Sequence, residues 1–358
     1  MNKNDILTIY GTDPEEMAKK IAEEANLAGL IGDRNKLIGL KPNLVVARPA
    51  SGGATTHPEI AAGLIDYLKS NGFKNIVILE GSWVGDSTAR AFSACGYSGF
   101  EKQGIKLIDT QKDSTRVMDC KGEKIEICSS ALSIDFMINL PVLKGHCQTL
   151  LTCALKNNKG LISDREKRRF HSLGLHVPIA HLNTVIKNDF ILVDGICGDL
   201  DFEEGGNPVF GGRLFAARDP VLCDTFAAEL MAYKPEDIPY IGLAEKLGVG
   251  KSGPYVLREL NKNSDAPPSP KPGGKAQKLS TFINEDSACS ACYASLIHAL
   301  SRIGMGKAQG RFQKKICIGQ GFKSKKGNTG IGNCTSGFAN SCKGCPPTAM
   351  EVLEFLNM

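Results

Sequence analysis

The sequence predicts an α/β protein with a mostly parallel sheet flanked by helices, in one or two lobes, followed by a small cysteine-rich module. Two observations carry this prediction. Over residues 1–260, short apolar or β-branched runs alternate with helical segments, which is the pattern of a parallel sheet covered on both faces. Near the C-terminus, six of the thirteen cysteines fall within the last seventy residues, which marks a region of different chemistry.

The individual elements follow from short patterns. Strands are predicted at 36–40, 76–79, 105–109, 135–140, 190–193 and 213–217, and a hairpin at 117–120 with 124–128. Helices are predicted at 56–71 with Thr56 as its cap, at 149–157, and from Asp219 to about 232. The charged run 164–171 predicts a solvated loop, or alternatively a basic lid over an anion site.

Composition divides the chain into three parts. Residues 1–262 form the predicted α/β body. Residues 263–280 form a predicted linker, since 263–278 contain four prolines, two glycines and almost nothing apolar. Residues 281–358 form the cysteine-rich module. It is too small and too poor in apolar residues to fold readily without a stabilising cross-link such as a bound metal.

Charge is distributed unevenly. Between residues 288 and 350 there are nine lysines and arginines and no aspartate or glutamate, although the whole chain carries only +5. Such a basic region suits a negatively charged metal–thiolate centre or an acidic electron carrier such as ferredoxin or flavodoxin. Nucleic acid is not the expected partner, because few aromatic side chains are available there for stacking on bases.

The N-terminal residues do not read as a signal peptide, and no run approaches the ~18–20 apolar residues that cross a bilayer. We therefore expect a cytoplasmic protein with no membrane association. In a reducing compartment, clustered cysteines are metal ligands or free thiols more often than disulfides.

The tail cysteines have metal-ligand spacing. They run Cys289-x2-Cys292, Cys317, Cys334 and Cys342-x2-Cys345, and Cys345 is followed by proline. One 4Fe–4S cluster is the expected occupant, because it needs four thiolates and a terminal Cys-Pro is typical of ferredoxin-type ligation. A structural zinc is the alternative, although forty-nine residues separate the two Cys-x2-Cys pairs, far more than the usual ~15–20.

Polar residues follow several predicted strands, at the edge where open α/β sheets bind ligands. The set predicted for this edge is Lys41, Asn43, Ser82, Lys144, His146, Asp194 and Asp219. With Lys156 and Lys159, the residues Lys144 and His146 predict a pocket for a carboxylate or phosphate. His146 is the candidate general acid–base, with Lys144 as its catalytic partner. As alternatives, Asp219 serves as a helix cap and Asp194 closes a turn.

Several strings taken in order resemble the family catalogued as domain of unknown function 362. They are Lys41-Pro42-Asn43, Thr56-His57-Pro58-Glu59, 143–146 (LKGH), 154–160 (ALKNNKG), Val193-Asp194-Gly195 and Asp219-Pro220-Val221, with 318–322, 330–334 and 344–347 in the tail. The resemblance spans about 36–250 and implies an α/β fold and an iron–sulfur association, without a reaction. It implies Cys289, Cys292, Cys334 and Cys345 as ligands, with Cys317 and Cys342 as the weaker candidates. A fainter likeness, in the order of elements, is to nickel-dependent lactate racemase.

Three functional hypotheses result. The first is an iron–sulfur oxidoreductase acting on an anionic small molecule, with the anion expected at Lys41, Asn43, Lys156, Asn157 and Asp194. The second is a non-redox binding or iron–sulfur assembly module. The third is a racemase- or lyase-like enzyme of carboxylates that uses His146 and Lys144 and has a structural metal. The sequence contains no phosphate-binding loop or dinucleotide fingerprint, so neither ATP nor NAD is implied.

Overall fold

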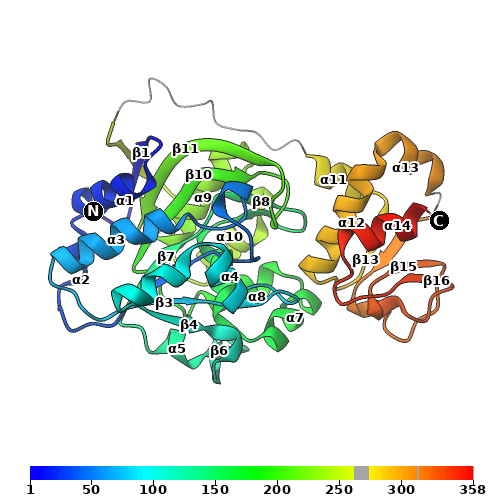
Figure 1. Ribbon diagram of the computed structural model, residues 1–358, viewed down its shortest axis with the longest axis horizontal. Helices are drawn as coiled ribbons and strands as arrows, with labels where there is room; N and C mark the ends of the chain where they lie inside the picture. The colour runs from blue at the N-terminus through cyan, green and yellow to red at the C-terminus, as the bar shows by residue number, and fades with distance from the viewer. Residues whose placement is uncertain (262–273, 313, 358) are drawn as a thin grey trace.

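The computed structural model describes residues 1–261, 274–312 and 314–357. Figure 1 shows a large body (blue to green) with a smaller lobe at one end (yellow to red), which contains the cysteine-rich module. Most of the predicted linker lies outside the described residues. Its last part, Lys275–Ser280, forms helix α11 and packs into the module through Ala276 and Leu279.

The body is built on one eight-stranded sheet with the order β12-β1-β11-β10-β7-β2-β3-β4. Five of its seven strand pairings are parallel, and β11 pairs antiparallel with both of its neighbours. The strands are β1 (Asp5–Tyr10), β2 (Ile38–Pro42), β3 (Ile76–Glu80), β4 (Lys106–Asp109), β7 (Phe136–Leu140), β10 (Phe190–Asp199), β11 (Pro208–Ala217) and β12 (Val256–Glu259). The predicted mostly parallel α/β sheet is confirmed.

Helices cover both faces of this sheet. One face carries α1 (Pro14–Glu24), α2 (Leu27–Ile31), α3 (Pro58–Ser70) and α4 (Thr88–Ala94). The other face carries α5 (Ser129–Leu132), α6 (Ala154–Asn157), α7 (Asp164–Ser172), α8 (His176–Leu182), α9 (Pro220–Leu230) and α10 (Pro239–Lys246). Two hairpins, β5 (Thr115–Cys120) with β6 (Glu123–Cys128) and β8 (Lys144–His146) with β9 (Leu150–Thr152), complete the body.

Alternation along the central strands supplies two hydrophobic cores. Ile191 and Val193 of β10 join the core beneath α7–α10, while Leu192 between them joins the core beneath α1–α4. Because successive strand residues point to opposite faces, a nearly continuous apolar run is what a sheet buried on both faces requires.

The module contains a four-stranded, all-parallel sheet in the order β13-β14-β15-β16. Its core includes Leu296, Ile297 and Leu300 of α12, and also takes in Cys147 and Phe202 from the body. Besides α11, its elements are β13 (Ile283–Glu285), α12 (Ser290–Ile303), α13 (Met305–Arg311), β14 (Ile316–Ile318), β15 (Thr329–Ile331), β16 (Asn340–Cys342) and α14 (Ala349–Asn357).

Several local predictions need correction. The charged run 164–171 is helix α7 and not a loop, because Ser163 caps it and Phe170 is buried beneath it. Thr56 does not cap α3; it donates to the carbonyl of Leu140, and His57 holds the cap position. Residues 149–157 are not one helix, since β9 precedes α6.

Three further differences concern strand and helix ends. Strand β1 lies in a segment that was not predicted as a strand. Strand β10 continues past Val193 to Asp199, which places Asp194 inside the strand. Asp219 caps α9, as its alternative interpretation proposed, but lies away from the ligand edge because β11 runs antiparallel. Within the described residues, no helix is both long and apolar enough to span a bilayer.

Replacing Leu192 by Ala should lower the free energy of unfolding by about 2–5 kcal/mol, because it opens a cavity beneath the central strand. Denaturant unfolding followed by circular dichroism measures the change. Val117→Ala on the exposed hairpin is the matched control and should cost no more than about 0.5 kcal/mol. Equal losses in the two variants would contradict this account of the core.

Candidate functional site

Four of the tail cysteines lie close enough to influence one another. Burial raises the pKa of the Cys289 and Cys292 thiols, and the neighbouring sulfurs of Cys334 and Cys345 raise both further. Burial likewise raises the pKa of Cys334, with Lys323 opposing this effect and Cys345 adding to it. These four are the cysteines that the family resemblance implies as ligands.

The other two tail cysteines point elsewhere. The Cys317 sulfur on β14 accepts a hydrogen bond from the Asn284 side chain at 3.5 Å. Cys342 ends β16 and is buried in the hydrophobic core of the module. Burial and then Glu351 raise the pKa of the Cys342 thiol, and no other tail cysteine is among these influences.

A helix start and a glycine lie beside the sulfurs. Cys289 is the N-cap of α12 and Cys292 lies in its first turn, so both thiols sit at a helix start. Gly332 has φ +85°, and a side chain there would lie 3.7 Å from the Cys292 sulfur and 3.6 Å from the carbonyl oxygen of Gly344. A glycine therefore keeps the backbone beside the sulfurs uncovered.

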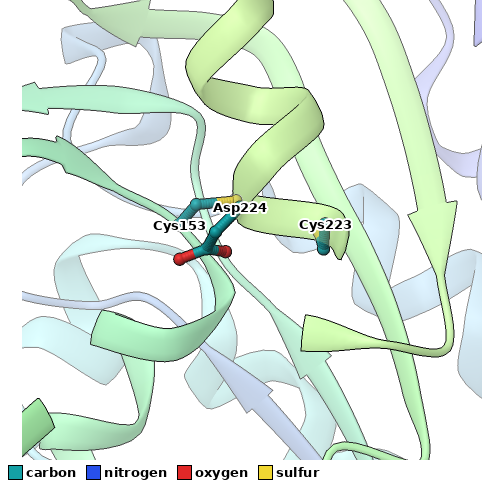
Figure 2. A group of neighbouring side chains, drawn as sticks. All are labelled: Cys153, Cys223 and Asp224. Carbon is teal, nitrogen blue, oxygen red and sulfur yellow. The ribbon is translucent and has the colours of Figure 1, made fainter. Parts of the chain in front are cut away.

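A second group of metal-ligand type lies in the body. Cys153, Cys223 and Asp224 are buried, and their ligand atoms lie within 4.8 Å of one another (Figure 2). Both Asp224 carboxylate oxygens already accept backbone N–H groups, from Ala154 at 2.7 Å and Leu155 at 3.2 Å. The Asp224 carboxylate thus accepts hydrogen bonds from the first two residues of α6 and links this helix to α9.

The module packs on the body through polar contacts around α12. The Ser290 hydroxyl lies 3.3 Å from Nε2 of His146 and 3.4 Å from Nε2 of His171. Gln148 donates to the carbonyl of Ala288 at 3.1 Å, and Gln320 donates to the carbonyl of Arg168 at 3.0 Å. These contacts fix the first turn of α12 against the polar end of the main sheet.

A cavity of about 70 Å³ lies at this junction. Cys289, Ser290 and Ala291 line it from the module, so one of the four clustered cysteines forms part of its wall. From the body it is lined by Asn43, Val45, Glu80, Gly81, Trp83, Val84, Thr152, Lys156, Asn157, Lys159, Gly160, Lys167, His171 and Glu203. The cavity therefore joins the cysteine group to the polar edge of the sheet.

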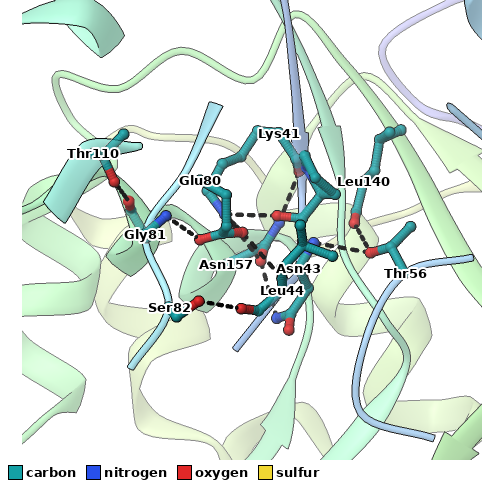
Figure 3. Close-up of polar contacts among 12 residues, drawn as sticks. Lys41, Asn43, Leu44, Thr56, Glu80, Gly81, Ser82, Thr110, Leu140 and Asn157 are labelled. Atoms are coloured by element: carbon teal, nitrogen blue, oxygen red, sulfur yellow. Dashed lines mark hydrogen bonds and ion pairs between the residues drawn. The ribbon is translucent and has the colours of Figure 1, made fainter. Parts of the chain in front are cut away.

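One side of the cavity rests on a buried ion pair (Figure 3). Lys41 Nζ lies 2.6 Å from Oε2 of Glu80, and Asn157 accepts from both Lys41 and Asn43. The backbone N–H of Gly81 donates to the other Glu80 oxygen at 2.7 Å. Gly160 is needed here, since a Cβ would meet Glu80 at 2.1 Å.

A second ion pair also borders the cavity. Glu203 receives Lys156 on one carboxylate oxygen and Nε2 of His146, at 2.8 Å, on the other. His146 Nδ1 accepts the backbone N–H groups of Gln148 and Thr149, so the proton is on Nε2 and is donated to Glu203. Burial raises the pKa of Glu203, but Lys156, His146 and Lys144 outweigh this and hold it well below its usual value.

Lys144 supports this arrangement from behind. Its ammonium is fully buried and donates to Asn43 Oδ1 at 3.1 Å, to the carbonyl of Glu203 at 2.8 Å, and to the carbonyl of Ala54. All three donors are therefore used. Burial, partly offset by Glu203, lowers the pKa of Lys144 to about 7.

Lys159 differs from the other cavity lysines. Within the described part of the chain its ammonium has no hydrogen-bond or ion-pair partner, whereas Lys167 binds Asp164 and the carbonyls of Gly81 and Ser82. Burial and the charge of Lys156 lower the pKa of Lys159 to about 7. His171 also faces the cavity, and its Nδ1 is buried without a partner among the described residues.

The predicted site residues divide into three groups. Asn43, Lys156, Asn157 and Lys159 line the cavity. Lys41, Lys144 and His146 lie behind its wall and hold the lining residues. Asp194 is not among the residues that line the cavity. Its carboxylate instead accepts the backbone N–H of His57 at 2.8 Å and lies 2.8 Å from Nδ1 of the same residue. The catalytic roles of His146 and Lys144 remain predictions.

Four titratable lining residues were not predicted as site residues. Glu80 ends β3 and could have been found by the strand-end rule that identified Lys41. Lys167 and His171 are four residues apart and therefore share one face of α7. This face was not predicted, because the segment was interpreted as a loop. Glu203 lies in a glycine-containing loop after β10 that carries no periodic signal.

Comparison with known proteins identifies the body. A family model described as "Domain of unknown function (DUF362)" matches residues 38–229. The "Thylakoid-associated protein sll1697" of Synechocystis is 24% identical over 247 residues, which are 64% of this chain and 73% of that protein.

Two solved structures align with part of the chain. The lactate racemase apoprotein of Thermoanaerobacterium thermosaccharolyticum aligns with TM-score 0.42 and 14% identity, over 63% of this chain and 56% of that one. A Thermotoga maritima protein aligns with TM-score 0.36 and 16% identity, over 66% and 60% respectively. The chain thus spans less than two thirds of the length of each of these two structures.

Glu203→Gln should lower the free energy of unfolding by about 3–5 kcal/mol, because it leaves the Lys156 ammonium buried without a counter-charge. Combining it with Lys156→Met should recover a large part of this loss. Chemical denaturation measures both variants, with the exposed Glu101→Gln as the control. A double variant as unstable as the sum of the two single variants would contradict the pairing.

The stability should also depend on pH through His146. Burial and the charge of Lys156 lower the pKa of His146 to about 4. The unfolded chain binds this proton near pH 6.5 and the folded chain only near pH 4, so unfolding becomes easier as the pH falls through this window. His146→Gln should reduce the slope by up to about 1.4 kcal/mol per pH unit. Denaturation series at stepped pH values measure it, and an unchanged slope would refute the assignment.

Proposed function

The chain belongs to the family described as Domain of unknown function (DUF362), and from that premise we propose that it is an iron–sulfur redox enzyme acting on an anionic small molecule. The anion binds in the cavity at the junction of body and module. One observation carries the proposal: Cys289, a ligand of the proposed cluster, lines the same cavity as Lys156 and Lys159. An electron acceptor held there would lie beside the metal centre.

Four thiols around a glycine-lined space suit one 4Fe–4S cluster held by Cys289, Cys292, Cys334 and Cys345. Zinc is the weaker fit. A tetrahedral zinc with bonds of about 2.3 Å brings its sulfurs to about 3.8 Å from one another. Within the described chain, the only three ligand atoms found within 4.8 Å of one another belong to Cys153, Cys223 and Asp224. The tail sulfurs are therefore spaced more widely than a zinc site requires. When bound, a cluster of this kind supplies electrons one at a time.

The residues of this chain then bind and shield the reactant. Lys159 offers an amino group without an ion-pair partner among the described residues, near Cys289 and Glu203, and the neutral pairs Lys41–Glu80 and Lys156–Glu203 flank it. Packing of α12 over the cavity limits the access of water, which strengthens the electrostatic interactions inside.

The electron donor is proposed to be an acidic carrier such as ferredoxin or flavodoxin. Cys345 is exposed, and so are the nearby basic residues Lys323, Lys326 and Lys343. A positive surface around an accessible cluster ligand favours docking of an acidic partner. We also propose a reducing, cytoplasmic location, which suits thirteen cysteines of which none forms a disulfide in the described chain.

The exposure of Cys345 also favours a second candidate, an iron–sulfur assembly module that passes its cluster to another protein. The racemase- or lyase-like alternative has less support. His146 and Lys144 would be its catalytic groups, but their side chains are buried behind the cavity wall and already engaged in hydrogen bonds.

Anaerobically purified protein should contain about four irons and four sulfides per chain and show absorbance that bleaches with dithionite. Serine at Cys289, Cys292, Cys334 or Cys345 should reduce the iron content by more than half. Cys317→Ser is the matched control and should retain the iron, because its sulfur faces Asn284. Bound zinc in place of iron, or loss of iron in the control alone, would contradict the proposal.

A further inference from the structure

The loop that follows β3 borders the cavity and also contacts the end of the cysteine-rich module. It covers residues 81–87, and its Trp83 and Val84 line the cavity. The next residue, Gly85, faces the module, since a Cβ there would lie 2.6 Å from Cδ and 3.1 Å from Cγ of Pro346. One short loop therefore connects a wall of the cavity with the module.

Glycine is required at this contact. Gly85 has φ +110°, a backbone conformation that other residues rarely adopt, and even the Cβ of alanine would collide with the ring of Pro346. Pro346 is half-buried at this position. Because no side chain lies between the glycine backbone and the proline ring, a displacement of Pro346 changes the support of the loop directly.

The module segment that touches the loop has few anchors of its own. Among the described residues, Cys345, Pro346 and Pro347 take part in no hydrogen bond, and the two prolines have no N–H group to donate. The nearest anchor on the N-terminal side is Gly344, which exchanges two hydrogen bonds with Asn333, at 2.8 and 2.9 Å. The sulfur of Cys345 is therefore the atom through which a bound metal would fix this segment.

Another part of the wall also belongs to a proposed cluster ligand. Cys289 and the two residues after it line the cavity from the start of α12. One boundary of the cavity thus contains a proposed ligand, and another contacts the residue that follows the ligand Cys345. Metal bonds to both sulfurs would hold these two boundaries at a fixed separation.

We propose that the loop 81–87 closes the cavity only when Cys345 is bound to the cluster. The bound cysteine holds Pro346 against Gly85, and this contact keeps Trp83 and the residue after it in place as a wall. Without the cluster the loop opens more often. This inference rests on the proposed function, because it takes Cys345 as a ligand, and it adds that the site for the reactant is complete only in the loaded protein.

The alternative is a wall that the body holds in place by itself. The backbone N–H of Trp83 donates to the carbonyl of Val45 at 3.0 Å, and the Asp86 carboxylate accepts the backbone N–H of Ala47 at 2.9 Å. If these bonds sufficed, loss of the cluster would leave the loop unchanged. The first of them also provides a reporter, because its amide exchanges with solvent only when the loop opens.

Hydrogen–deuterium exchange with mass spectrometry tests the coupling on the full chain, before and after anaerobic removal of iron with a chelator. The Trp83 amide should exchange at least about 5-fold faster without iron. Pro346→Ala with its iron retained should raise the rate about 5- to 10-fold, because it removes the two ring carbons that face Gly85. Pro208→Ala, at the exposed start of β11, is the matched control and should exchange as the unaltered protein does.

Acrylamide quenching gives an independent reading. Trp83 is the single tryptophan of the chain, so its fluorescence reports the exposure of this wall alone. At equal iron content, quenching should be stronger in Pro346→Ala than in Pro208→Ala.

Iron and sulfide are assayed on every sample, so that each contrary outcome has a distinct meaning. Bound iron with an unchanged Trp83 rate in Pro346→Ala would overturn this inference alone, and so would an unchanged rate after iron is removed from the unaltered protein. The second comparison decides the matter if Pro346→Ala does not retain its iron. Equally faster exchange in the distant helix α3 would show general loosening and would also overturn the coupling. Absence of iron from the anaerobic preparation would instead overturn the proposed function.

Discussion

The contact between the first turn of α12 and the polar end of the main sheet is the interaction on which the candidate site depends. Ser290 lies between His146 and His171, and the adjacent Cys289 forms part of the cavity wall. Without this contact the body would present an open row of lysines and glutamates, and the module would present cysteines with no binding site beside them. The packing of two parts of the chain therefore creates a site that neither part contains alone.

Burial of so many charges at one sheet edge is tolerated because most of them are paired. Taking an isolated charge out of water is expensive, and the glutamates each receive a lysine and further N–H donors. His146 stays neutral and uses both ring nitrogens, one as an acceptor and one as a donor to Glu203. Lys159 differs from the other lining lysines in having no ion-pair partner among the described residues; burial lowers its pKa, and the nearby Glu203 and Cys289 partly oppose this effect.

The sequence predicted the sheet and the four neighbouring cysteines because both leave local signals. β-branched runs such as 76–79 identify buried strands, and cysteine spacing with a family resemblance identified Cys289, Cys292, Cys334 and Cys345. Strand-end reasoning also found Asn43, and the predicted basic pocket for an anion found Lys156. The same reasoning could not predict the antiparallel direction of β11, which places Asp219 at another edge of the sheet. It also could not predict that β10 extends far enough to include Asp194. Both depend on long-range pairing. The contributions of Glu203 and His171 depend on how a loop and a charged helix pack against α12, which no local pattern records.

The central claim is that a single iron–sulfur cluster is bound by these four cysteines beside the cavity. Diffraction from anaerobically grown crystals, collected on both sides of the iron absorption edge, tests it most directly. The account predicts one strong iron peak enclosed by the sulfurs of Cys289, Cys292, Cys334 and Cys345, adjoining the cavity of Lys159. A peak that responds at the zinc edge instead, or iron located at Cys153, Cys223 and Asp224, would contradict it.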